Sequence, residues 1–198
     1  MDNDLSSEYW NKRYLSNEAG WDLGQISTPL KSYFDQLQNK NAFILIPGAG
    51  NAYEAEYLFN NGFKQVYVCD LAAEPLLNLK QRCPSFNSQH LLQQDFSKLK
   101  DLNFDLIVEQ TFFCALNPAL CAAYFKKAAE LLKPGGKLAG VLFDDVLNSD
   151  KPPFGGNRQE YVSYIKPPLL IKTLEPCYNS IKPRQGRELF INLVKDHH

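Results

Sequence analysis

The residues best suited to do chemistry in this chain follow two apolar runs. The run Phe43–Ile46 leads into Pro47-Gly48-Ala49-Gly50, and Asp70 ends a second run about twenty residues later. A Gly-x-Gly turn after a buried strand brings backbone N–H groups close to a ligand, and an acidic residue at the end of the next strand accepts ribose hydroxyls. The pattern predicts a nucleoside site, although a lone Gly-x-Gly is equally typical of a tight turn that binds nothing.

The residues after Gly50 indicate which nucleoside cofactor fits. A dinucleotide fingerprint needs a third glycine where this chain has Tyr53, and Glu54 in the first helical turn repels phosphate. The site therefore favours a ligand with a ribose and a positively charged end, such as S-adenosylmethionine. Tyr53 disfavours an NAD-linked oxidoreductase.

Length and composition indicate one globular domain over residues 1–198. The chain is 44% hydrophobic and carries a formal net charge of −1 without a basic run, which predicts no nucleic-acid partner. We expect no membrane span, and the start at Met1-Asp2-Asn3-Asp4 lacks the pattern of a signal peptide.

The cysteines and histidines indicate a reduced, metal-free protein. The five cysteines are scattered without Cys-x-x-Cys spacing, which predicts free thiols in a cytoplasm. His90 is the only histidine outside the C-terminal pair His197-His198, which is native or a remnant, so we predict no metal site.

Periodicity and turn signals predict alternating strands and helices. We expect helices at about 6–15, from near Pro29, at 52–60, 73–82 and 117–132, and a short one after Asn157. We expect strands at 42–46, 66–69, 90–92, 104–109, 137–143, 169–174 and 188–194. This order predicts an α/β fold with a doubly wound, mostly parallel sheet covered on both faces.

An ordered series of motifs then resembles one family. The motifs are Trp10-Asn11-Lys12-Arg13-Tyr14, Gly20-Trp21-Asp22-Leu23-Gly24, Pro47-Gly48-Ala49-Gly50, Asp70, Gln94-Asp95-Phe96, the block 104–116, Leu131–Gly136, Pro152-Pro153-Phe154 and Pro183–Glu188. Together they resemble class I S-adenosylmethionine-dependent methyltransferases of the thiopurine S-methyltransferase family, particularly the plant-type halide/thiol methyltransferase branch.

This resemblance implies a Rossmann-like sheet of seven strands, the last antiparallel, with an N-terminal helical cover over residues 1–40. It implies that Gly48 and Gly50 approach the cofactor, Asp70 and the adjacent Leu71 bind near the ribose, and Asp95 and Phe96 hold the adenine. Glu109 or Gln110 would lie beside the methionine end. The resemblance also implies a set of residues that cover the cofactor and line the acceptor pocket: Trp10, Tyr14, Trp21, Phe112, Phe113, Phe154 and Arg184.

Some residues depart from the family pattern, and several retain a simpler interpretation. Tyr14 stands where tryptophan is usual and Gln110 where tyrosine or arginine is usual, so both leave the methyl acceptor open. Asp95 alone is also typical of a helix cap, and Glu109 of a surface charge at a strand end. The pair Arg184 and Arg187 fits surface ion pairs as well as attraction of an anionic acceptor.

The chemistry implied is methyl transfer to a small soft nucleophile such as a thiol, thiopurine, thiocyanate or halide. A sulfonium methyl group is already activated, so transfer needs an acceptor in line and exclusion of water. No catalytic base or nucleophile stands out, and Cys114 fits a small buried apolar residue. We expect a monomer or weak homodimer; the alternative is a catalytically silent cofactor-binding protein.

Overall fold

A computed structural model describes residues 5–197 and places one seven-stranded sheet at the centre of the protein. Met1–Asp4 and His198, which enter the predictions about the two termini, lie outside the described residues. The strands are β1 (Phe43–Pro47), β2 (Gln65–Asp70), β3 (Leu91–Gln93), β4 (Phe104–Gln110), β5 (Leu132–Phe143), β6 (Leu169–Pro176) and β7 (Glu188–Lys195).

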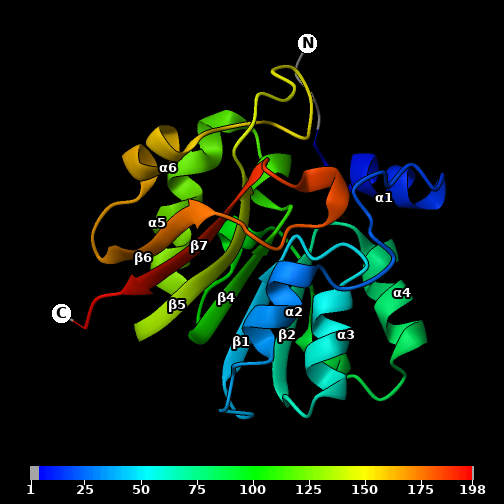
Figure 1. Ribbon diagram of the computed structural model, residues 1–198. Coiled ribbons are helices and arrows are strands. Elements are labelled where there is room, and N and C mark those ends of the chain that lie inside the picture. The colour runs from blue at the N-terminus through cyan, green and yellow to red at the C-terminus, as the bar shows by residue number, and fades with distance from the viewer. Residues whose placement is uncertain (1–4, 198) are drawn as a thin grey trace.

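The strand order is β3-β2-β1-β4-β5-β7-β6, and β7 alone runs antiparallel to its neighbours. The order reverses between β1 and β4, where the loops leaving these strands diverge to opposite sides of the sheet and open a crevice. The predicted fold class is confirmed: a doubly wound, mostly parallel sheet with an antiparallel last strand (Figure 1).

Helices cover both faces of the sheet, so its central strands are apolar on both sides (Figure 1). One face packs against α2, α3 and α4, and the other against α5 and α6. The helices are α1 (Ser7–Leu15), α2 (Thr28–Phe34), α3 (Tyr53–Asn60), α4 (Ala73–Arg82), α5 (Cys121–Leu131) and α6 (Arg158–Tyr164). Short 3-10 helices are η1 (Ser88–His90), η2 (Phe96–Lys98), η3 (Phe113–Ala115), η4 (Pro118–Leu120) and η5 (Lys182–Arg184).

Two predicted boundaries differ from the structure by more than two residues. The Asn117 side chain caps the 3-10 helix η4, and the α-helix α5 begins only at Cys121. Strand β5 begins at Leu132, five residues before the predicted start at Lys137, because Leu132 pairs with Phe104 across a register shift. The proline and glycines of this segment therefore form an irregular strand entrance, not a separate loop.

Helix α1 lies over one end of the sheet with no buried residue of its own. Ser6 caps its first turn, and two polar contacts join the helix to the region after β2. The Ser7 hydroxyl donates to the carbonyl of Leu71 at 2.8 Å, and the N–H of Glu74 donates to the Asn11 side chain at 3.1 Å. Among residues 5–197, no helix combines the length and apolar character needed to cross a membrane.

Candidate active site

The turn between β1 and α3 forms the floor of the site. Gly48 and Gly50 adopt left-handed backbone conformations, with φ of 54° and 52°. Such conformations favour glycine because a Cβ would be strained. Ala52, the N-cap residue of α3, is also left-handed with φ of 56°. The turn therefore keeps the backbone shape that three glycines would favour.

Asp70 ends β2 beside this turn and is almost fully buried. The N–H of Gly50 donates to Oδ2 at 2.9 Å, and the N–H of Ala72 donates to Oδ1 at 2.8 Å. A carboxylate has about four acceptor positions, so each oxygen retains capacity toward the cavity that Asp70 lines. Burial raises the pKa of Asp70, while these backbone hydrogen bonds oppose the rise. This geometry suits a vicinal diol such as that of ribose.

Three aromatic side chains from the N-terminal segment cover the turn. The ring centroids of Trp10 and Trp21 lie 5.6 Å apart and those of Tyr14 and Trp21 lie 5.8 Å apart, both edge to face. A Cβ at Gly50 would lie 2.7 Å from the Tyr14 hydroxyl oxygen, which receives a hydrogen bond from the Trp21 indole N–H at 3.3 Å. The predicted aromatic cover therefore lies directly above the Gly-x-Gly turn.

Asp95 and Phe96 follow β3 at the same edge of the sheet. Asp95 accepts a hydrogen bond from the N–H of Ser97 at 2.8 Å and so caps η2, as its simpler interpretation anticipated. Both Asp95 and Phe96 nevertheless line the cavity, and the second Asp95 oxygen is left for another donor. Capping and ligand binding are compatible at this position.

Of the two residues predicted beside the methionine end, Glu109 and Gln110, Glu109 lies behind the cavity wall. Its side chain is fully buried and does not line the cavity. The N–H groups of Phe112 and Phe113 donate to Oε1 at 2.9 and 2.8 Å, and the Tyr124 hydroxyl donates to Oε2 at 2.6 Å. Burial raises the pKa of Glu109 to about 7. Glu109 thus fixes the turn after β4 from beneath.

That turn presents Thr111 and Phe112 to the cavity and turns Phe113 away. Thr111 has φ of 56°, which is rare for a β-branched residue. Phe112 packs on Gly48 so closely that a Cβ there would lie 2.0 Å from its ring. Phe113 instead packs in the core against Tyr124 at a centroid distance of 5.3 Å and does not line the cavity, contrary to its predicted place.

The loop 144–157 also corrects one prediction. Phe154 is not among the residues that line the cavity, and its backbone N–H donates to the Cys114 carbonyl at 2.7 Å. The preceding Pro152 and Pro153, together with Leu147, line the cavity instead. In Figure 1 this loop, drawn in yellow, rises above the sheet at the same end as α1.

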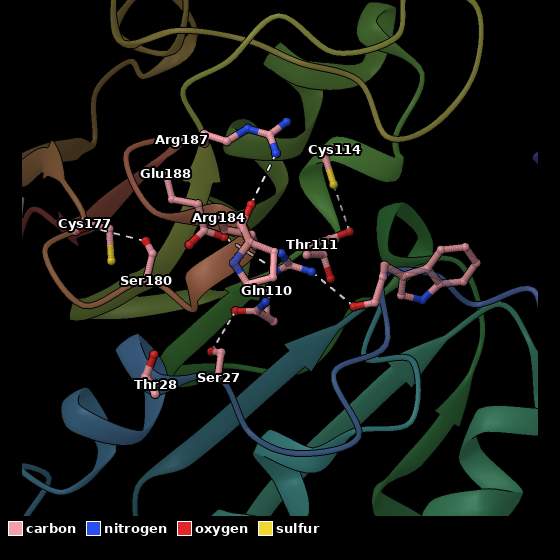
Figure 2. A network of polar contacts seen from close by, with 12 residues as sticks. Ser27, Thr28, Gln110, Thr111, Cys114, Cys177, Ser180, Arg184, Arg187 and Glu188 are labelled. Atoms are coloured by element: carbon pink, nitrogen blue, oxygen red, sulfur yellow. Dashed lines mark hydrogen bonds and ion pairs between the residues drawn. The ribbon is translucent and has the colours of Figure 1, made fainter.

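Gln110 ends β4 and lines the cavity beside a residue that sequence reasoning missed. The Ser27 hydroxyl donates to Gln110 Oε1 at 3.0 Å (Figure 2). The Ser27 N–H donates to a Glu54 carboxylate oxygen at 3.2 Å. Burial raises the pKa of Glu54, and the charge of Arg184 opposes that rise. Ser27 carried no sequence signal beyond its position before the helix at Pro29.

Arg184 reaches the same end of the cavity from η5. The residue is 8% exposed, its Nη2 donates to the Trp21 carbonyl at 3.1 Å, and its Nη1 lies 3.5 Å from a Glu188 carboxylate oxygen. Arg187 also lines the cavity, but it is half-exposed and pairs with Asp145. The two arginines therefore have different surroundings within the same cavity.

These elements enclose one large cavity of about 630 Å³ at the carboxyl ends of β1, β2 and β4. Its size is typical of small-molecule sites. Its wall contains the predicted residues Trp10, Tyr14, Trp21, Gly48, Gly50, Asp70, Leu71, Asp95, Phe96, Gln110, Phe112 and Arg184. Glu54, the charge that the sequence placed beside the glycine turn, lies in the same wall, and sequence reasoning missed Thr111, Leu147 and Pro183 there. The roles of the wall residues remain proposals.

The model of the family described as Thiopurine S-methyltransferase (TPMT) matches residues 5–195. The chain belongs to the thiopurine S-methyltransferase family. It is therefore a methyltransferase whose cofactor is S-adenosylmethionine, which confirms the predicted family, enzyme class and cofactor. Asp70 fits that cofactor because its carboxylate oxygens can accept hydrogen bonds from ribose hydroxyls. The glycine turn beside it lacks the third glycine that a dinucleotide pyrophosphate needs.

Similar proteins include plant and bacterial members of this family. "Probable thiol methyltransferase 2" of Arabidopsis thaliana is 28% identical over 189 residues, covering 92% of this chain and 83% of that protein. "Thiopurine S-methyltransferase" of Vibrio cholerae serotype O1 (strain M66-2) is 25% identical over 163 residues, covering 74% and 75%. "Thiocyanate methyltransferase 1" of Brassica oleracea is 23% identical over 183 residues, covering 90% and 81%.

Solved structures with the same fold are methyltransferases at low identity. The chain is similar to a Burkholderia thailandensis 1,6-didemethyltoxoflavin-N1-methyltransferase with bound S-adenosylhomocysteine, with a TM-score of 0.75, 16% identity, and 96% and 87% of the two chains covered. It is also similar to the magnesium protoporphyrin IX methyltransferase of Synechocystis PCC 6803 with bound SAM, with a TM-score of 0.73, 13% identity, and 99% and 100% covered. These likenesses concern the fold.

Proposed function

We propose that this methyltransferase methylates a small soft nucleophile, namely a thiol, a thiopurine, thiocyanate or a halide. One observation carries the proposal: a single cavity is lined by Asp70 and the glycine turn, by the aromatic cover, and by Gln110 and Arg184. The groups suited to the cofactor and those suited to an acceptor therefore face the same space. The printed names of the relatives, which include thiol, thiopurine and thiocyanate methyltransferases, support the same acceptor classes.

When bound, S-adenosylmethionine supplies an activated sulfonium methyl group. The chain's own residues then need to bind the cofactor and the acceptor, hold the acceptor atom in line with the methyl group, and exclude water. Asp70 would accept the ribose hydroxyls, and Asp95 with Phe96 would hold the adenine. The rings of Trp10, Tyr14 and Trp21 would face the positively charged sulfur, where cation–π attraction contributes up to about 2 kcal/mol in a desolvated site.

The cavity wall supports transfer without a dedicated general base. Among the described residues that line it, no histidine or lysine occurs. Its carboxylates already accept hydrogen bonds from the protein: Asp22 from Asn51, Glu54 from Ser27, Asp70 from Gly50, and Asp95 from Ser97. Soft nucleophiles that arrive as anions need no proton removed, which matches this wall.

Calorimetry with S-adenosylhomocysteine tests the cofactor part of the proposal. Asp70→Asn keeps the side-chain shape but removes the charge, and the loss of charge-assisted hydrogen bonds should weaken binding roughly 10- to 100-fold. Asp105→Asn is a matched control, because Asp105 pairs with Lys133 near the other end of β4. Equal affinities of wild type and Asp70→Asn would remove Asp70 from the cofactor site.

A panel assay with labelled methyl donor tests the acceptor. The panel contains aromatic and aliphatic thiols, a thiopurine, thiocyanate and iodide, each with purified full-length chain. Turnover of at least one compound is the expected result. Failure of every compound, with cofactor binding intact, would overturn the acceptor classes proposed here and leave the silent cofactor-binding alternative.

We also propose a cytoplasmic, single-domain protein that is a monomer or a weak homodimer. The five cysteines are all free and buried, which agrees with a reducing compartment. The N-terminal segment and the C-terminal connection are joined through contacts such as Thr28 with Asn179, which supports one domain. Sedimentation of the purified chain measures the oligomeric state directly.

A further inference from the structure

The guanidinium of Arg184 lies in the cavity wall with part of its donor capacity unused. The residue is 8% exposed and lines the cavity. Nη2 donates to the Trp21 carbonyl, and Nη1 is enclosed within the protein, 3.5 Å from a Glu188 carboxylate oxygen. A guanidinium has five N–H donors, so Arg184 retains donors for an acceptor group in the cavity that it lines.

A second donor, Gln110, lines the same cavity as this guanidinium. Figure 2 shows both residues, with the Ser27 hydroxyl bonded to the Gln110 side chain. The hydrogen bond from Ser27 is the only side-chain hydrogen bond of Gln110 within residues 5–197, and it occupies the amide oxygen. The amide nitrogen of Gln110 is therefore left to donate toward the cavity that the residue lines.

Ser27 is unusual for its place in the fold. It is the N-cap residue of α2, where a serine ordinarily accepts a hydrogen bond from the first helical turn. Here its side chain makes no cap hydrogen bond and is directed to Gln110 instead. The residue is 3% exposed, so its hydroxyl is held in this orientation by packing.

The charge changes during methyl transfer decide what this donor pair can hold. The acceptor sulfur forms a bond to the methyl carbon while the bond from that carbon to the sulfonium breaks. The electron pair stays with the departing thioether, so the thiolate and sulfonium charges both disappear and no proton moves. Donors placed on the reacting sulfur would stabilise the ground state more than the transition state and slow the reaction.

We infer that Arg184 and Gln110 bind an anionic group of the acceptor that does not react, and that Ser27 is a positioning residue for Gln110. The inference rests on the proposed function and narrows its acceptor class to thiols that also carry a carboxylate or similar oxyanion. Halides and thiocyanate lack such a group, because their single charge is consumed by the reaction.

A matched pair of substrates tests this subsite. The compounds 4-mercaptobenzoate and its methyl ester share the aromatic thiol and differ in the charge at the far end. Wild-type chain should show a higher kcat/KM for the carboxylate, and Arg184→Met should lower the carboxylate-to-ester ratio roughly 10- to 100-fold, the range for a hydrogen bond to a charged group. Ser27→Ala should lower the same ratio roughly threefold, and Ser27→Thr, which keeps the hydroxyl, should restore it.

Arg187→Met is the control, because Arg187 lines the same cavity but pairs with Asp145 near the surface. Its carboxylate-to-ester ratio should stay within about twofold of wild type. Preference of wild type for the ester, an unchanged ratio in Arg184→Met, or a loss in Arg187→Met instead would each overturn the inference. If Arg184→Met does not fold, the double variant Arg184→Met with Glu188→Gln is used in its place. It removes both charges of the Arg184–Glu188 pair and so leaves no buried carboxylate without its partner.

Calorimetry separates this inference from the proposed function. The product analogue 4-(methylthio)benzoate is titrated into chain saturated with S-adenosylhomocysteine, or into the chain alone if that nucleoside does not bind. Binding by wild type that is lost in Arg184→Met supports the subsite even when no thiol is turned over. Equal binding by both proteins, or binding by neither, contradicts the subsite while the methyltransferase panel stands independently.

Discussion

Replacing Glu109 by glutamine should change how the stability of this protein depends on pH. Glutamine keeps the size and the acceptor oxygen for the N–H groups of Phe112 and Phe113, and its amide nitrogen can donate to the Tyr124 oxygen. It cannot ionise. The variant therefore removes one titrating group from the fully buried turn after β4 and leaves the packing nearly the same.

The magnitude follows from the shifted pKa of Glu109, which burial raises from 4.5 to about 7. A raised pKa means that the folded protein binds the proton more tightly than the unfolded chain. The contribution to stability is thus complete below the unfolded pKa and is lost as pH rises through the folded one. At about 1.4 kcal/mol per pKa unit, the full loss is about 3 kcal/mol, of which roughly 2 to 3 kcal/mol falls between pH 5 and pH 8.

Urea unfolding of wild type and Glu109→Gln at these two pH values measures the effect. Wild type should lose roughly 2 to 3 kcal/mol relative to the variant on going from pH 5 to pH 8. Other titrating groups are shared by both proteins and cancel in the difference. Glu130→Gln provides the control, because Glu130 is an exposed residue of α5 that pairs with Lys127 at 3.4 Å.

A difference between wild type and Glu109→Gln that is the same at both pH values, within about 0.5 kcal/mol, would refute the reasoning. It would mean that the Glu109 carboxyl keeps its ordinary pKa despite burial. The same result would mean that the turn carrying Thr111 does not depend on the protonation of Glu109.

Three further expectations concern the floor of the site, a helix cap and the aromatic cover. Gly48→Ala should destabilise the fold by roughly 1 to 3 kcal/mol, since its Cβ would lie 2.0 Å from the Phe112 ring. In a double-mutant cycle measured by urea unfolding, Phe112→Ala should suppress much of that cost. Additive effects of the two substitutions would contradict the contact. Asn157→Ala should cost about 1 kcal/mol in the same assay, because the Asn157 side chain caps α6, and no change would show the cap to be dispensable. The only two tryptophans of the chain, Trp10 and Trp21, both line the cavity, so S-adenosylhomocysteine should change the intrinsic fluorescence, and a flat titration at saturating ligand would place binding elsewhere.

The fold was largely predictable because its signals are local. A strand, a glycine turn and a helix follow one another in the chain from Phe43 to Asn60, and Asp70 ends the next parallel strand. Parallel neighbours bring their carboxyl ends to the same edge of a sheet, so chain order alone placed Asp70 beside Gly50. The proline–glycine segment after Leu132 was mispredicted, because its pairing partner Phe104 lies far away in the sequence.

The direction of individual side chains was decided by tertiary structure. Phe112 and Phe113 are adjacent and identical in type, yet one faces the cavity and the other the core, because Glu109 and Tyr124 fix the turn between them. Arg184 and Arg187 likewise differ only in what the fold places around them. Residue type and spacing determined which chemistry this protein could assemble, since those depend on short-range patterns. Which groups actually face the cavity depended on contacts between segments distant in the chain, whose side-chain orientations no local pattern encodes.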